Sequence, residues 1–313
     1  MAGYERRPGT LRDAFRKLLH NYGAPLGMFL FFVLAALYVF MGRGGKPAPE
    51  FPRTPSEFMQ TSKAERRLAE LRRRIEANPD DMAALAESGR IKYQLGESRY
   101  IEAIADLEKA RSLGLADART FFYLGSMYQA VGLYDFAAQE YRRFLNNYPD
   151  DAEARMLLAK LCYSNGDFPG AIKEYERLLT ARKDDPVLLE NLALARWKNS
   201  QDYQPALAQL RSLGASGVFL ADYAEGRIAY ESKDYQKAQT SLERAGSAAS
   251  TAGSFADLPS LFRMAADAAW RNNDYASAER SLGELLRLDP GSQDGRDLAA
   301  KVAKARAPGR GGR

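Results

Sequence analysis

Histidine and cysteine are almost absent from this chain of 313 residues. Cys162 is the single cysteine, which excludes an intramolecular disulfide and a cysteine metal cluster. His20 is the single histidine and lies near the N-terminus, so most of the chain has no histidine that could act as a catalytic base. A glycine-rich phosphate-binding loop is missing as well. The sequence therefore predicts a protein that is not an enzyme and that has neither a metal nor a cofactor.

Long runs of β-branched residues are also missing, while alanine, leucine, tyrosine and arginine are abundant, which favours an all-α fold. The formal net charge of +5 is unevenly placed. Residues 1–46 carry seven Lys/Arg and two acidic residues, and basic and acidic residues balance over 47–313. Because a nucleic-acid-binding domain needs a basic face, we expect no nucleic-acid partner.

Residues 25–41 form an apolar run without a charged residue. At 1.5 Å per residue a helix of this length spans about 26 Å, close to the thickness of a bilayer core. We interpret it as a transmembrane helix that anchors the chain. A buried core helix is one alternative. A cleaved signal peptide is another, although residues 42–47 offer no small-x-small cleavage site.

The orientation of this anchor follows from the flanking cations. Five Lys/Arg precede the run and three follow it within a similar distance. This favours a cytoplasmic N-terminus and a periplasmic C-terminal part at a bacterial inner membrane, but the small margin leaves the inverted topology open. Within the basic segment 1–24, residues 10–22 have the pattern of an interfacial helix, with solvated chain as the alternative. Residues 42–59, which are rich in glycine and proline, are predicted to be a linker.

From residue 79 the sequence repeats itself. Similar segments begin near residues 96, 132, 166, 201, 233 and 273. They share an alanine a few places after an aromatic residue, at intervals of 34, 34, 35, 32 and 40 residues: Ala103, Ala137, Ala171, Ala206, Ala238 and Ala278. This pattern resembles the tetratricopeptide repeat, in which two antiparallel helices approach most closely at a small residue.

The resemblance is strongest in the second unit, where Leu124, Gly125 and Tyr128 match the first helix and Ala137 and Tyr141 match the second. It implies an all-α tetratricopeptide-repeat solenoid of about six repeats over residues 79–290. We expect capping helices at 60–78 and 291–306, followed by a disordered tail at 307–313. Three acidic pairs that stand beside a proline at the end of a repeat, Asp80-Asp81, Asp150-Asp151 and Asp184-Asp185, are interpreted as helix caps rather than metal ligands.

The same resemblance implies that the first helices of the repeats line a concave groove that binds protein. The residues that it places there are Arg90, Tyr93, Phe122, Met156, Lys160, Tyr163, Trp197, Lys198, Tyr223, Arg227, Tyr230, Trp270 and Arg271. Aromatic rings interleaved with cations suit an extended peptide segment, particularly an acidic one. Packing between neighbouring units is the alternative role for each of them.

These observations predict a membrane-anchored scaffold for protein–protein interactions. We expect it to act in assembly, secretion or export at the bacterial cell envelope, as a component of a membrane complex. The alternatives are a cytosol-facing receptor for targeting sequences and a non-catalytic accessory subunit of a membrane-bound synthase.

Overall fold

The computed structural model describes residues 50–55, 61–248 and 257–306. These residues contain helices and no strand. The predicted transmembrane helix at 25–41, the basic segment 1–24 and the tail 307–313 lie outside the described residues. Within the described residues, no helix is both long enough and apolar enough to cross a membrane.

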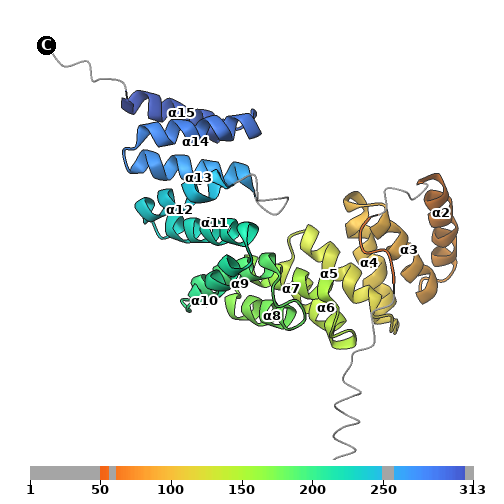
Figure 1. Ribbon diagram of the computed structural model, residues 1–313. Coiled ribbons are helices and arrows are strands. Elements are labelled where there is room, and N and C mark those ends of the chain that lie inside the picture. The colour runs from red at the N-terminus through yellow and green to blue at the C-terminus, as the bar shows by residue number, and fades with distance from the viewer. Residues whose placement is uncertain (1–49, 56–60, 249–256, 307–313) are drawn as a thin grey trace, which may run out of the picture.

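The described helices follow one another along the chain and are labelled in Figure 1. Their bounds are α2 (Thr61–Ala77), α3 (Met82–Gln94), the 3-10 helix η1 (Glu97–Arg99), α4 (Tyr100–Ser112), α5 (Arg119–Ala130), α6 (Tyr134–Asn147), α7 (Ala152–Ser164), α8 (Phe168–Ala181), α9 (Pro186–Lys198), α10 (Gln204–Ser212), α11 (Ala215–Glu231), α12 (Tyr235–Ser247), α13 (Leu258–Arg271), α14 (Tyr275–Leu288) and α15 (Gln293–Arg306).

Aspartate side chains begin the first helices of several repeats. Asp81 accepts a hydrogen bond from the amide of Ala84 at 3.0 Å, and Asp151 accepts one from Ala154 at 2.9 Å. Asp185 caps α9 in the same way. Each carboxylate satisfies an amide that has no partner inside its own helix, as an N-cap does. The prediction that the acidic pairs supply helix caps is confirmed at these three positions.

Small residues allow the two helices of a repeat to pack closely. The six alanines that mark the repeats are all buried, five of them with no exposed surface. A Cβ atom at Gly125 would lie 3.0 Å from the ring of Tyr141, and one at Gly226 would lie 2.6 Å from Leu242. Both glycines are on the first helix of a repeat and face its second helix. The small-residue pattern therefore reports the helix–helix contact, as expected for close packing.

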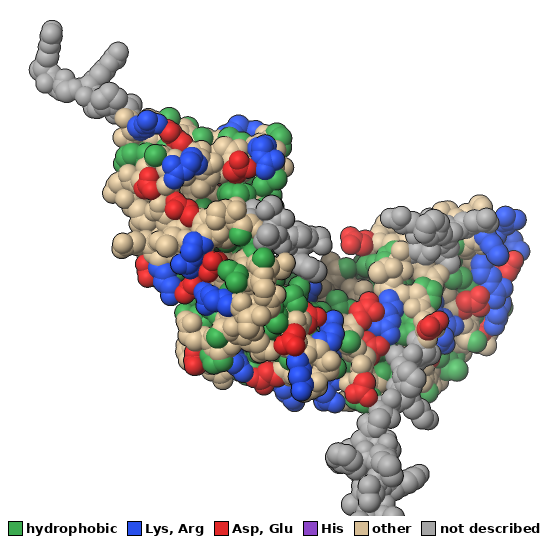
Figure 2. All heavy atoms as spheres, viewed as in Figure 1, with side chains coloured by type: hydrophobic (Ala, Val, Ile, Leu, Met, Phe, Trp, Pro, Cys, Tyr) green, Lys and Arg blue, Asp and Glu red, His purple; other side chains and the backbone are tan. Residues whose placement is uncertain are grey.

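The helix pairs α3–α4, α5–α6, α7–α8, α9–α10, α11–α12 and α13–α14 stack into a curved solenoid (Figure 1). The predicted all-α solenoid fold is confirmed. In Figure 1 the second helices α6, α8, α10 and α12 lie outside the bend, while the first helices α7, α9 and α11 lie inside it. The surface is hollowed between the two arms of the bend, with acidic and basic side chains interspersed around it (Figure 2). Helices α2 and α15 pack on the two ends of the stack.

Candidate partner-binding face

The first helices of the six repeats form a surface that we call the first-helix face. All thirteen predicted groove residues belong to these helices, distributed over α3, α5, α7, α9, α11 and α13. They differ in exposure. Tyr93, Phe122 and Tyr223 are buried in the hydrophobic core. Lys160 and Arg271 are exposed, and the remaining eight, which are Arg90, Met156, Tyr163, Trp197, Lys198, Arg227, Tyr230 and Trp270, are half-buried.

The N-terminal part of this face is covered by residues 50–55, which we call the strap. The ring of Phe51 makes edge-on contacts with Phe122, Tyr123 and Phe144, with centroids 5.4, 5.5 and 6.1 Å apart. These three rings belong to α5 and α6. Residues 50–55 are part of the predicted linker, so this portion of the linker packs against the repeats. Phe122 is therefore buried among Phe51 of the strap and Tyr141 and Phe144 of α6.

Arg53 connects the strap to the third repeat. Its guanidinium donates two hydrogen bonds to Asp151, at 2.9 and 2.6 Å, and a third to Glu153 at 2.9 Å. The same group lies over the rings of Phe51 and Phe122, 4.8 and 5.0 Å from their centroids. Paired nitrogens facing both oxygens of one carboxylate, with aromatic rings beneath, are an arrangement that arginine forms and lysine does not.

The strap also forms a hydrogen bond with Tyr93 and affects the pKa of Asp151. The hydroxyl of Tyr93 on α3 donates to the backbone carbonyl of Arg53. Burial acts to raise the pKa of Asp151, but the hydrogen bonds from Arg53 and from the Ala154 amide outweigh it, so the pKa lies below its ordinary value. Asp151 is therefore ionised at neutral pH, and it both caps α7 and holds Arg53.

The C-terminal part of the first-helix face is organised by ion pairs between successive first helices. Arg227 on α11 donates to Glu190 on α9 at 3.3 Å, and its guanidinium lies 5.5 Å from the ring of Tyr223. Burial raises the pKa of Glu190 to about 7, although Arg227 acts to lower it. Glu190 is the carboxylate on this face whose charge changes near neutral pH.

Other cations on this part of the face are paired as well. Lys198 contacts Glu231 at 2.5 Å and lies 4.5 Å from the ring of its neighbour Trp197. Asp267 on α13 accepts hydrogen bonds from the hydroxyl of Tyr230 and from Arg271, both at 2.7 Å. These contacts join α9 to α11 and α11 to α13, so the face is a connected network of charges.

Burial, together with the hydrogen bond to Asp267, raises the pKa of Tyr230 to about 12. The hydroxyl therefore stays protonated at physiological pH and acts as a donor to Asp267.

The carboxylates of this network were not among the predicted groove residues. Glu190 and Asp267 lie on the first helices, at positions where a partner on the next helix is within reach. Their signal in the sequence is a charge on an otherwise apolar helix, as in the segment PVLLENLALA around Glu190. Phe51 and Arg53 were missed for another reason. They lie outside the repeats, and Asp151 is 98 residues away from Arg53.

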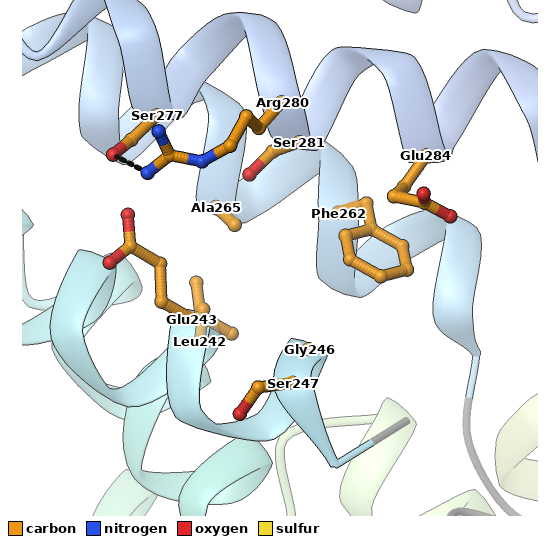
Figure 3. A pocket seen from close by; sticks show the side chains of 10 residues that line it. All are labelled: Leu242, Glu243, Gly246, Ser247, Phe262, Ala265, Ser277, Arg280, Ser281 and Glu284. Atoms are coloured by element: carbon orange, nitrogen blue, oxygen red, sulfur yellow. Dashed lines mark hydrogen bonds between the residues drawn. The ribbon is translucent and has the colours of Figure 1, made fainter. Parts of the chain in front are cut away.

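A separate groove lies between the second helices α12 and α14, with α13 at its base (Figure 3). Arg280 donates to the hydroxyl of Ser277 at 2.7 Å along one wall, and Phe262 stands at the other end. The small residues Ala265 and Gly246 are among those that line it. None of the predicted groove residues lines it, so it is distinct from the first-helix face.

Comparison with known proteins agrees with this architecture. Residues 124–186 match the family model described as tetratricopeptide repeat. The structure resembles the C-terminal part of a TPR repeat-containing protein from Cytophaga hutchinsonii, with a TM-score of 0.52 and 18% identity, over 76% of this chain and 95% of that one. No curated protein matches the sequence at a significant level. The fold is a helical solenoid of the tetratricopeptide-repeat type.

Two other solved structures are similar at lower scores. PilW, described as a widely conserved type IV pilus biogenesis factor, has a TM-score of 0.48 and 18% identity over 67% of this chain and 98% of its own. PilF from Pseudomonas aeruginosa has a TM-score of 0.43 and 18% identity over 70% of this chain and 97% of its own.

Proposed function

We propose that this chain is a non-catalytic scaffold that binds a segment of a protein partner on its first-helix face. The observation that carries the proposal is the set of half-buried aromatic side chains on the C-terminal part of that face, including Trp197, Tyr230 and Trp270. Large aromatic residues supply most of the binding energy where partners meet, and here they are surrounded by groups that hydrogen-bond and carry charge.

The paired charges refine the predicted preference for acidic segments. Arg227, Lys198 and Arg271 already contact carboxylates of the same face. An acidic partner must compete with these carboxylates, so the gain in Coulomb energy is smaller than three unpaired cations would supply. We therefore expect the aromatic contacts to determine the affinity and the charge network to determine where along the face the segment binds.

The test is recovery of partners from membranes in mild detergent with the tagged full-length chain. The variant Trp197→Ala/Tyr230→Ala removes two rings from the face. A matched control, Tyr134→Ala/Phe136→Ala, removes two rings that are 46% and 55% exposed at the start of α6. We expect the first variant to lose the partner and the control to keep it. Unchanged recovery with the folded first variant would refute the proposal.

The proposed setting is the bacterial inner membrane, with the anchor at residues 25–41, the N-terminus in the cytoplasm and the repeats in the periplasm. The distribution of Lys/Arg around the apolar run supports this setting. A reporter that is active only in the periplasm, fused after Arg313, tests it. Activity of a cytosol-only reporter at the same position would instead favour a cytosol-facing receptor.

A further inference from the structure

The strap is held mainly through two side chains. Phe51 and Arg53 make the ring and ion-pair contacts, whereas Glu50, Pro52, Thr54 and Pro55 are exposed. The backbone carbonyl of Arg53 accepts the hydrogen bond from Tyr93. The strap therefore sits on the face as a bound peptide does, with alternate side chains entering a pocket and the others facing solvent.

The pocket that receives these side chains has a definite chemistry. Its apolar wall consists of Phe122, Tyr123 and Phe144, and its acidic wall consists of Asp151 and Glu153. An aromatic ring fills the first part, and a guanidinium bridges the second while stacking on the rings. Because Pro52 lies between them and Pro55 follows, the backbone is biased toward an extended conformation before it binds, which lowers the entropy lost on docking.

We propose that this pocket is a recognition site for an extended segment with an aromatic residue followed two positions later by arginine. The strap occupies the site in cis, so a partner segment with this pattern binds by displacing residues 50–55. The inference rests on the proposed scaffold function and assigns a second, chemically different site to the same face. This site is acidic and prefers a basic segment, in contrast to the cation-bearing C-terminal part of the face.

Competition in cis sets the expected affinities. Residues 56–60 connect the strap to α2, and a connection this short gives the strap an effective concentration of about millimolar. A peptide in trans must exceed that concentration to fill the pocket of the unaltered chain. A chain whose own strap has lost both anchoring side chains presents the same pocket without a competitor.

The experiment measures binding of a fluorescein-labelled peptide with the sequence of residues 49–56 to the full-length chain in detergent. We expect saturable binding to Phe51→Ala/Arg53→Ala, with an apparent Kd at least tenfold lower than for the unaltered chain. Adding Asp151→Asn and Glu153→Gln to this variant should abolish the binding, and the asparagine still caps α7. A peptide with lysine in place of arginine should bind at least fivefold more weakly, because lysine does not pair with both oxygens of Asp151.

A second readout tests occupancy in cis without added peptide. Trypsin cleaves after Arg53 only when the side chain leaves Asp151, so we expect Phe51→Ala to speed cleavage of the 53–54 bond at least tenfold. Glu65→Gln, which removes an ion pair to Arg99 away from the strap, should leave the rate unchanged. Equal cleavage rates for the unaltered chain and Phe51→Ala, or no peptide binding to the folded double variant, would overturn the inference. If the double variant binds no peptide but still recovers its partner, this inference fails while the scaffold proposal stands.

Discussion

The two ends of the first-helix face carry similar aromatic residues, but these residues differ in how deeply they are buried. In the N-terminal part, Tyr93 and Phe122 are buried and contact the strap, which comes from outside the repeats. In the C-terminal part, Trp197, Tyr230 and Trp270 keep part of their surface, and neighbouring first helices supply the carboxylates that pair Lys198 and Arg227. The repeat position of an aromatic residue therefore places it on a first helix, while its surroundings determine whether it is buried or remains accessible.

The largest expected effect is on stability, and it differs between a ring of the N-terminal part, Phe122, and a ring of the C-terminal part, Trp197. Phe122 is 1% exposed, so Phe122→Ala should lower the free energy of unfolding by about 3–5 kcal/mol through lost burial and the cavity left behind. Trp197→Ala removes a half-buried ring and should cost about 1 kcal/mol. Urea denaturation followed by circular dichroism measures both. Similar losses for the two variants would contradict the distinction between the two parts of the face.

The next effect depends on pH and is confined to the C-terminal part. The pKa of Glu190 is about 7 in the folded chain, above the ordinary value of 4.5. The folded chain therefore binds this proton more tightly than the unfolded chain, and the contribution of Glu190 to stability falls as the pH rises from 4.5 to 7.

Glu190→Gln, which resembles the protonated form, removes this dependence. We expect the variant to gain roughly 2–3 kcal/mol relative to the unaltered chain between pH 5 and pH 8. Thermal denaturation at several pH values measures the gain, with Glu279→Gln as a control on the surface of α14. A constant difference between Glu190→Gln and the unaltered chain would argue against a raised pKa.

The third effect concerns Asp151, which holds Arg53 of the strap. Asp151→Ala removes both the cap of α7 and the ion pair with Arg53, and should lower the free energy of unfolding by about 2 kcal/mol. Asp151→Asn keeps the cap, so it should cost about half as much. Denaturation of the two variants in parallel separates the two contributions. Equal losses would mean that the cap contributes little beside the ion pair.

The smallest expected effect concerns the ion pair between Lys198 and Glu231 in the C-terminal part. Lys198 and Glu231 are about one-third exposed, with side-chain exposures of 32% and 37%. Because water and salt screen such a pair, Lys198→Ala should change stability by less than about 0.5 kcal/mol. Its effect on partner recovery is expected to be larger than its effect on stability. A loss of stability comparable to that of Asp151→Ala would show that the pair is not screened.

The sequence was sufficient to predict the solenoid because the packing of each repeat depends on local, regularly spaced residues. The buried alanines such as Ala137 and Ala171, and the glycines such as Gly125, meet the partner helix of their own repeat. Such short-range contacts leave a period in the sequence. The same period placed all thirteen predicted residues on the first helices.

The exposure of those residues could not be predicted in the same way. Phe122 contacts Phe51, and no period links a residue in the predicted linker to the second repeat. The pairing of Lys198 with Glu231 depends on the rotation between two neighbouring repeats, which spacing alone does not give. Contacts between distant segments therefore set the chemistry of the face.

The docking of Arg53 against Asp151 also determines how the chain carries mechanical force. A pull on the residues ahead of position 50 is borne first by the strap and passes from Arg53 into the N-terminus of α7 in the third repeat. While that contact holds, the terminal helix α2 lies outside the line of tension and is not peeled from α3. Force applied at the third repeat must break the contacts of Phe51 and of Arg53 together. Force applied at α2 would instead open the solenoid one helix at a time.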